Sequence, residues 1–225
     1  MTLKALIFGE LGALAEVDDL HRRAYNESFR ASGLDWEWPA ESYSPAFSRA
    51  VARHRLVAHA ESLGQQIDAT AILARKDDAF DRLLAGEGVA LRDGVRETMD
   101  AARQAGVRLA LVPGQDAEDT RKVFDALGGQ AEMAEFDEIT YPDDTRAAKP
   151  DPAPYQQTLK LMGLRAREVV AVENCPETAH SPLSAGIATY GYPAAPARAA
   201  LFPLDVIRLP RLSPEILQHP SDAAA

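Results

Sequence analysis

The side chains best suited to chemistry lie next to segments that predict strands or helices. Lys149 precedes a predicted helix start at Pro152, while Glu173 and Asn174 follow the apolar run Val169–Val172. A lysine beside a carboxylate can neutralise it or help to hold an anion. Glu173 alone makes a poor Mg²⁺ site, because Mg²⁺ requires several hard oxygen ligands in a near-octahedral shell. Alternatively, Lys149 is an ordinary surface residue and the Asn174 amide satisfies backbone groups of its loop.

The segment after the first apolar run, Leu3–Phe8, is poor in reactive groups. Gly9 has no side chain, and Leu11 can neither transfer a proton nor bind a metal. Glu10 stands between them, but neighbouring side chains of a strand point to opposite faces. We therefore expect Glu10 to point away from the side on which position 9 lies, and Leu11 to pack against neighbouring loops.

A cluster of acidic residues follows the apolar run Arg108–Val112. Pro113 ends this run and offers neither a hydroxyl nor an amide hydrogen. Asp116, Glu118 and Asp119 then open the next predicted helix. A free helix N-terminus attracts anions, and carboxylates in its first turn compete for the same positive end. We predict that they cap the helix and offset its dipole, which contributes about 1 kcal/mol.

Apolar runs that predict strands recur at wide spacing, with helical patterns between them. The central runs are nearly continuous, which is typical of parallel strands buried on both faces. This alternation predicts an α/β fold with a doubly wound parallel sheet, which binds ligands at the carboxyl ends of its strands. A late start is predicted for the helix after Asn174, at Ser181-Pro182. The predicted strands are Leu3–Phe8, Arg108–Val112, Glu168–Val172, Ile187–Tyr190 and Asp205–Leu209, and the helices between them are Gly94–Ala105, Ala117–Leu127 and Pro152–Met162.

The interval 16–88 differs from the rest of the chain because it contains helical patterns and no convincing strand. Glycine and proline residues separate these patterns. We therefore predict an α/β core domain made of 1–15 and 89–225, and an inserted helical cap domain made of 16–88. The predicted helices of the insert are Asp18–Ser32, Ala46–Ser62, Ala69–Leu73 and Asp77–Ala85.

Four segments stand in a recognisable order and spacing: Asp19–Phe29, Ala90–Val95, Ala148–Pro152 and Val172–Asn174. Together with the opening Lys4–Leu14 they resemble the haloacid dehalogenase (HAD)-like hydrolases over nearly the whole chain. Within that superfamily they resemble the branch of β-phosphoglucomutase and the CbbY-like sugar-bisphosphate phosphatases. The resemblance implies a Rossmann-like core that carries a helical cap.

The resemblance also implies that the catalytic positions of this chain are degenerate. In the family, an aspartate after the first strand attacks phosphorus and a second aspartate is the general acid/base. Gly9 and Leu11 occupy these two positions. Ala13 and Pro113 stand where the family has residues whose hydroxyls are available to the site, so none of the four positions is catalytically intact.

A vestigial site is implied at Lys149, Glu173 and Asn174. The family lysine neutralises the nucleophile and the phosphate, and two carboxylates at the positions of Glu173 and Asn174 complete a Mg²⁺ site with the first aspartate. Because Gly9 and Asn174 lack carboxylates, we expect neither a bound metal nor another cofactor. We expect Lys149 to point into the old site and to hydrogen-bond Glu173 directly or through one water.

Basic residues of the insert are further candidates for anion binding. A stretch of the family's cap that contacts substrate corresponds to Val51–Arg55, in which the flexible glycines are absent. Arg53, Arg55 and His21, together with Lys149, could still hold an anion. Alternatively, Arg53, Arg55 and His21 belong to solvated helix faces.

Composition excludes several classes of partner. The formal net charge of −10 over 225 residues disfavours binding to nucleic acid or to an anionic membrane. The chain has one cysteine, Cys175, so it cannot form an internal disulfide, and we expect a reducing, cytoplasmic location.

The leading hypothesis is a CbbY-like pseudophosphatase that binds a metabolite or another protein. The alternative is a phosphatase that acts on a small sugar phosphate through a rearranged site. The two differ in whether phosphate esters are turned over in the presence of Mg²⁺.

Overall fold

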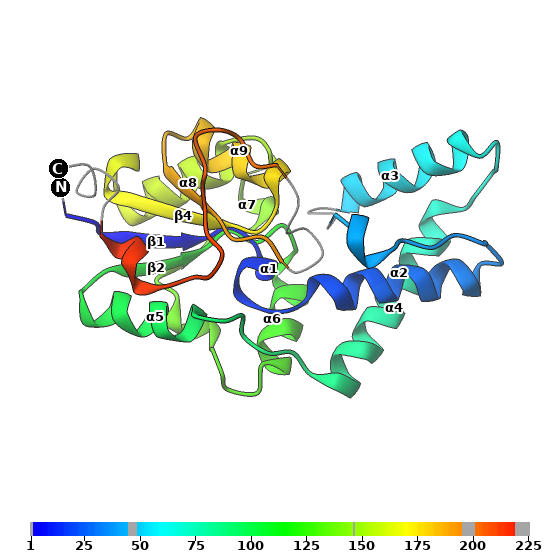
Figure 1. Cartoon of the computed structure of the whole chain (residues 1–225), viewed down its shortest axis with the longest axis horizontal. Helices are drawn as coiled ribbons and strands as arrows, with labels where there is room; N and C mark the ends of the chain where they lie inside the picture. Colours follow the sequence, from blue (N-terminus) through cyan, green and yellow to red (C-terminus); the bar gives the residue numbers. More distant parts are fainter. Residues whose placement is uncertain (1, 45–48, 146, 195–200, 219–225) are drawn as a thin grey trace.

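The computed structural model describes residues 2–44, 49–145, 147–194 and 201–218, which form a sheet-centred unit and a helical extension (Figure 1). The sheet has six parallel strands in the order β3-β2-β1-β4-β5-β6. The predicted α/β fold with a doubly wound parallel sheet is confirmed. The strands are β1 (Ala5–Phe8), β2 (Arg108–Leu111), β3 (Glu138–Ile139), β4 (Val169–Glu173), β5 (Ala188–Gly191) and β6 (Ile207–Arg208).

Both faces of the central strands β1 and β4 are buried, as the continuous apolar runs predicted. On β1, Leu6 and Phe8 join a core cluster with α5 (Val95–Gln104) and α6 (Ala117–Ala126). Ala5 and Ile7 point to the other face, where the second cluster includes Tyr155 of α8 (Ala153–Met162). Figure 1 shows α5 and α6 on one side of the sheet and α8 and α9 (Pro176–Ser184) on the other. The remaining short helices are α1 (Leu11–Leu14), α7 (Pro142–Thr145) and the 3-10 turns Ala40–Ser42, Met133–Glu135, Ala166–Glu168 and Pro214–Leu217.

Two features of the core differ from the sequence prediction. Strand β3 was not predicted, because its two residues are too few to show a periodic pattern. The prediction of a late start for the helix after Asn174 is wrong, since α9 spans Pro176–Ser184 and contains Pro182. Pro176 fits the first turn, where no backbone donor is required, and Pro182 removes only one hydrogen bond near the C-terminal end.

The helical extension consists of α2 (Asp18–Ala31), α3 (Arg49–Ser62) and α4 (Ala69–Glu87), which lie beyond the carboxyl end of β1 (Figure 1). Tyr25, Phe29 and Trp36 contribute to an apolar cluster within it. The N-terminal part of α2 and the C-terminal part of α4 pack instead on the core cluster, through residues such as Leu20 and Leu84. The extension therefore has an apolar cluster of its own and an apolar base on the core.

The prediction of two helices at Ala69–Leu73 and Asp77–Ala85 is wrong, because α4 is continuous. No glycine or proline interrupts residues 74–76, and all three are good helix formers. The predicted start of the preceding helix at Ala46 lies outside the described residues, in which α3 begins at Arg49. No helix in the described ranges is long and apolar enough to cross a membrane.

Candidate functional site

Three loops meet where β1, β2 and β4 end. Phe8 of β1 is level with Leu111 of β2 and Val172 of β4, so the residues that follow these strands are neighbours. Gly9 begins the first loop and its backbone N–H donates to the Val172 carbonyl at 2.8 Å. Lys149 reaches the same place from the loop before α8. The parallel sheet thus gathers side chains that are far apart in the sequence.

Lys149 lies between two carboxylates inside the protein. Its Nζ donates to Glu10 Oε1 at 2.6 Å and to Glu173 Oε1 at 3.3 Å, and it also donates to the Gly9 carbonyl. Lys149 and Glu10 are each 5% exposed, and Glu173 is 0% exposed. The predicted hydrogen bond between Lys149 and Glu173 is present. Glu10 is a second and closer partner, which the sequence did not indicate.

The prediction that Glu10 points away from this site is wrong. Strict alternation holds inside a strand, but β1 ends at Phe8, and Glu10 is the residue that precedes α1. The Glu10 side chain turns toward the strand ends, where its Oε2 accepts a hydrogen bond from the Gly114 backbone N–H at 3.1 Å. Glu10 therefore connects the loop after β1 with the loop after β2.

The cluster of Glu10, Lys149 and Glu173 holds one cation against two carboxylates. Burial raises the pKa of Glu10 to about 7; the charge of Lys149 opposes the rise and that of Glu173 adds to it. Burial lowers the pKa of Lys149, but the carboxylates of Glu10 and Glu173 raise it more, so it lies above its ordinary value. Lys149 is thus a cation at neutral pH, whereas the pKa of Glu10 is raised toward neutrality.

The space beside Gly9 is filled by other side chains. The Tyr155 hydroxyl donates to Glu173 Oε1 at 2.6 Å, and the Thr178 hydroxyl donates to Glu173 Oε2 at 2.7 Å. A Cβ atom added at Gly9 would lie 2.2 Å from Glu173 Oε1 and 2.3 Å from the Tyr155 hydroxyl oxygen. An aspartate at position 9 would therefore collide with both groups.

Asn174 belongs to a second buried pair, with Asp18 of α2. Its Nδ2 donates to Asp18 Oδ2 at 3.0 Å, while its Oδ1 has no hydrogen-bond partner among the described residues. Burial raises the pKa of Asp18 to about 6, although Arg92 and the Asn174 amide oppose the rise. A Cβ atom at Gly12 would lie 2.2 Å from Asn174 Nδ2, so this close approach requires glycine.

The side chains at the strand ends do not fit Mg²⁺. Both oxygens of Glu173 already accept hydrogen bonds, and the Lys149 ammonium stands where it would repel a second cation. Among the described side chains in the loops that follow these strands, the buried oxygens without a hydrogen-bond partner are Asn174 Oδ1 and Gln115 Oε1, both of which are neutral amide oxygens. Across the described ranges, no group of three or more His, Cys, Asp or Glu side chains is placed to hold a metal ion. A near-octahedral oxygen shell is therefore not available from these residues.

Leu11, Ala13 and Pro113, which the resemblance places at positions of the family's site, carry no reactive group. Leu11 is 1% exposed and Ala13 is fully buried, so both pack in the core. Pro113 is buried directly after β2. The Asp116 carboxylate accepts from the Asp119 backbone N–H at 2.9 Å and caps α6, as predicted.

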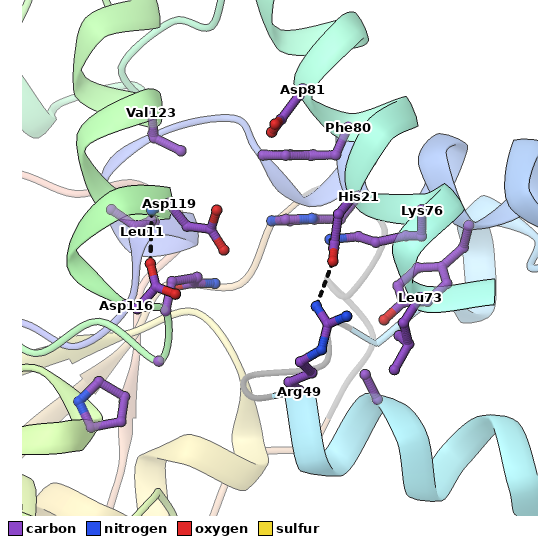
Figure 2. Close-up of a pocket in the computed structure, with 16 residues that line it drawn as sticks. Leu11, His21, Arg49, Leu73, Lys76, Phe80, Asp81, Asp116, Asp119 and Val123 are labelled. Atoms are coloured by element: carbon purple, nitrogen blue, oxygen red, sulfur yellow. Dashed lines mark hydrogen bonds and ion pairs between the residues drawn. The ribbon is translucent and has the colours of Figure 1, made fainter. Parts of the chain in front are cut away.

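A cavity of about 280 Å³ lies between the helical extension and the core. In Figure 2, Asp119 of α6 and Asp116, which caps this helix, face His21 and Phe80 of the extension. The rings of His21 and Phe80 stack at 3.9 Å with an interplanar angle of 4°. Burial, and the nearby charge of Lys76, hold the pKa of His21 well below its usual range, so this ring is neutral at pH 7. The remaining lining includes Leu11, Tyr25, Arg49, Leu73, Asp77, Asp81 and Val123.

Only His21 of the four candidate anion-binding residues lines this cavity. Arg53 is exposed and donates to the Thr70 hydroxyl at 3.2 Å, and Arg55 donates to the Ser44 carbonyl. Lys149 lies instead in the buried cluster with Glu10 and Glu173. The basic residues that do line the cavity, Arg49 and Lys76, are both paired with Asp77.

Arg49 and Lys76 were not identified as site residues from the sequence, for different reasons. Lys76 falls in the gap between two predicted helices, whereas in the continuous α4 it lies one turn from Leu73 and from Phe80, on the same face. This i, i+3 and i, i+4 spacing is the signal that could have found it. Arg49 begins α3 and carries no local signal of its own.

Comparison with known proteins connects this site to a family. The model of the haloacid dehalogenase-like hydrolases matches residues 4–186. CbbY of Rhodobacter capsulatus is 31% identical over 216 residues, which cover 95% of each chain. CbbY of Cereibacter sphaeroides is 30% identical over 175 residues, which cover 76% of each chain.

Solved structures agree with the sequence comparison. A crystal structure of CbbY from Rhodobacter sphaeroides in complex with phosphate matches with a TM-score of 0.74 and 26% identity, over 96% of this chain and 97% of that one. A mutant of the same protein in complex with xylulose-(1,5)bisphosphate matches with a TM-score of 0.73 and 27% identity, over 93% and 95% of the chains. The chain therefore belongs to the haloacid dehalogenase-like hydrolase family, and its relatives in that family include the CbbY proteins.

Proposed function

We propose that this protein is a CbbY-like pseudophosphatase, which binds a small molecule or a protein partner and does not transfer phosphoryl groups. The observation that carries the proposal is the filled space beside Gly9. A missing nucleophile can be replaced only if another group, or water, can stand in line with phosphorus. Here the Glu173 carboxylate and the Tyr155 hydroxyl occupy the space in which a side chain at position 9 would begin, so this space is closed to a replacement group or to water.

The rest of the cluster supports the same proposal. Leu11 supplies no proton for a leaving group, and Lys149 is already neutralised by Glu10 and Glu173. Because the side chains around Glu173 do not fit Mg²⁺, the proposed function requires no metal. Loss of one catalytic group typically lowers a rate by several powers of ten, and here several are absent together.

The cavity between α2, α4 and α6 is the proposed place for a small-molecule ligand. Its volume of about 280 Å³ is near the low end of ligand-binding sites. Its wall is aromatic on one side and acidic on the other, and its two basic side chains are paired with Asp77. These features favour a ligand without a phosphate dianion.

The test is turnover of phosphate esters by the purified full-length protein with Mg²⁺. The probes are p-nitrophenyl phosphate and xylulose-(1,5)bisphosphate, with CbbY from Rhodobacter sphaeroides assayed alongside under identical conditions. We expect no release of phosphate above the protein-free background. Clear turnover that disappears in Glu10→Gln or Glu173→Gln would overturn the proposal, and would favour instead a hydrolase that uses the buried carboxylates in a rearranged site.

A further inference from the structure

We propose that the Glu10 carboxylate is a tethered occupant of an oxyanion site, whose donors are the Lys149 ammonium and the Gly114 backbone N–H. The inference rests on the proposed function in one respect, namely that position 9 supplies no competing carboxylate. The inference gives a specific reason to expect weak binding of free phosphate by this protein. The site retains its two hydrogen-bond donors, but the Glu10 carboxylate already occupies them.

The geometry of Glu10 is that of a bound anion. One oxygen accepts from Lys149 at 2.6 Å, and the other accepts from the Gly114 N–H at 3.1 Å. The donors come from two separate loops, which precede α8 and follow β2. The side chains of the ion pair are 3% exposed for Lys149 and 6% exposed for Glu10. A charged donor and a backbone N–H that converge on two oxygens form the arrangement by which proteins hold carboxylates and phosphates.

The backbone conformation around Glu10 places its carboxylate beside the two donors. Gly9 stays hydrogen-bonded to the end of β4 through its N–H, while the Glu10 carbonyl accepts from the Ala13 N–H at 3.0 Å in the first turn of α1. Glu10 is therefore fixed on both sides along the chain. A carboxylate attached to the chain beside its donors acts as an intramolecular ligand with a high effective concentration. Free anions in solution displace such a ligand only when their own concentration is high.

Charge reinforces the exclusion of free anions. Lys149 already faces Glu10 and Glu173, so a phosphate that entered beside both carboxylates would meet net negative charge. Removal of the Glu10 side chain leaves one carboxylate opposite the ammonium and frees the Gly114 N–H.

Removal of Glu10 would also make room. A small hollow beside the cluster is lined by Pro113, Gly114, Ala148 and Lys149, and Gly114 lines the larger cavity as well. The side chain of Glu10 fills the position between the donors that border this hollow. Its truncation would create a space that carries both donors and lies next to the larger cavity.

The experiment compares anion binding by the full-length wild type and by Glu10→Ala. Inorganic phosphate is titrated by calorimetry and by thermal melting, with sodium chloride added to match ionic strength. We expect no phosphate-dependent rise in the melting temperature of the wild type, and a saturable rise in Glu10→Ala with an affinity at least about tenfold higher. Acetate, which resembles the excised group, should also stabilise Glu10→Ala and not the wild type.

Three further variants serve as controls. Glu10→Gln keeps the position filled and should remain unresponsive to phosphate. Asp116→Asn removes one negative charge from the cavity wall, keeps a side-chain oxygen that can cap the helix, and should show no response to phosphate, like the wild type. Lys149→Met in the Glu10→Ala background should abolish the response to phosphate.

The outcomes decide the proposal even if Glu10→Ala is unstable. Where that variant unfolds without added anion, recovery of a melting transition in phosphate supports the tethered anion, and lack of recovery overturns it. A folded Glu10→Ala that ignores phosphate and acetate also overturns it, as does a wild type that binds phosphate equally well. This result is independent of the phosphatase assay. Turnover of phosphate esters by the wild type would refute the proposed function, whereas the comparison of phosphate binding by wild type and Glu10→Ala would still test the tethered anion.

Discussion

Replacement of Lys149 by methionine should destabilise the fold strongly, because it leaves two buried carboxylates without their cation. Lys149→Met preserves much of the side-chain volume and removes the hydrogen bonds to Glu10 and Glu173. Loss of one partner from a buried ion pair typically costs about 3–5 kcal/mol of the free energy of unfolding. Glu173 keeps the hydroxyl donors of Tyr155 and Thr178, so we expect a loss near the lower end, about 3 kcal/mol.

The loss should depend on pH in a defined direction. Burial already raises the pKa of Glu10 to about 7, and removal of Lys149 removes the charge that opposes this rise. A carboxyl group whose pKa is higher in the folded than in the unfolded state favours folding when protonated, and loses that contribution as pH rises through the folded pKa. Lys149→Met should therefore be least destabilising at acidic pH and most destabilising above neutrality.

The measurement is urea unfolding of wild type and variant at about pH 5.5 and about pH 8, on either side of the Glu10 pKa. Glu10→Gln combined with Lys149→Met should recover part of the loss at the higher pH. Lys4→Met is the matched control, because Lys4 also pairs with a glutamate, at 2.7 Å from Glu168, but its side chain is 53% exposed, so less than about 1 kcal/mol is expected. A loss below about 1 kcal/mol for Lys149→Met, equal at both pH values, would refute the reasoning.

The remaining predictions concern the positions around the cluster. Restoring both aspartates, as Gly9→Asp with Leu11→Asp, should not restore phosphatase activity and should lower the melting temperature, because the Glu173 carboxylate and the Tyr155 hydroxyl fill the space at position 9; turnover by this double variant would contradict that account. Millimolar Mg²⁺ should leave the melting temperature of the wild type unchanged, since a ligand stabilises only as far as it binds the native state, and a large rise that is lost in Glu173→Ala would argue for a metal site. Asp18→Asn should gain stability relative to the wild type as pH rises from about 4 to about 7, because the pKa of Asp18 is raised from 3.8 to about 6 in the folded state. Over that interval the free energy of unfolding of the wild type should fall by up to about 3 kcal/mol, whereas the amide introduced by Asp18→Asn does not titrate. Parallel stability profiles of the two proteins in chemical denaturation would show that Asp18 titrates normally.

The buried cluster also explains how Lys149 can be accommodated in the interior of the protein. A buried ammonium without a partner carries a large desolvation cost. Glu10 and Glu173 remove that cost for Lys149, and Tyr155 and Thr178 satisfy the oxygens of Glu173. Lys149 therefore contributes to the structure without a substrate phosphate nearby.

The sequence by itself determined which chemistry the residues at three positions cannot supply. Gly9, Leu11 and Pro113 carry no group that attacks phosphorus, moves a proton or offers a hydroxyl, and no fold can supply a functional group that the side chain does not have. The sequence also predicted β1, β2, β4 and β5, because apolar runs buried on both faces of a parallel sheet depend on local composition alone.

Only the tertiary structure decided which groups meet. Glu10 was expected to point away from the site, yet it hydrogen-bonds Lys149 and Gly114, because the backbone leaves the strand conformation at Gly9. These partners could not be predicted from a local pattern, because they are more than 100 residues away in the sequence. In the same way, Tyr155 fills the space beside Gly9 from another element, and Lys76 and Arg49 line the cavity in place of Arg53 and Arg55. Residue types are local properties of a chain, whereas the filling of a site depends on distances across the sheet and between helices that no local pattern encodes.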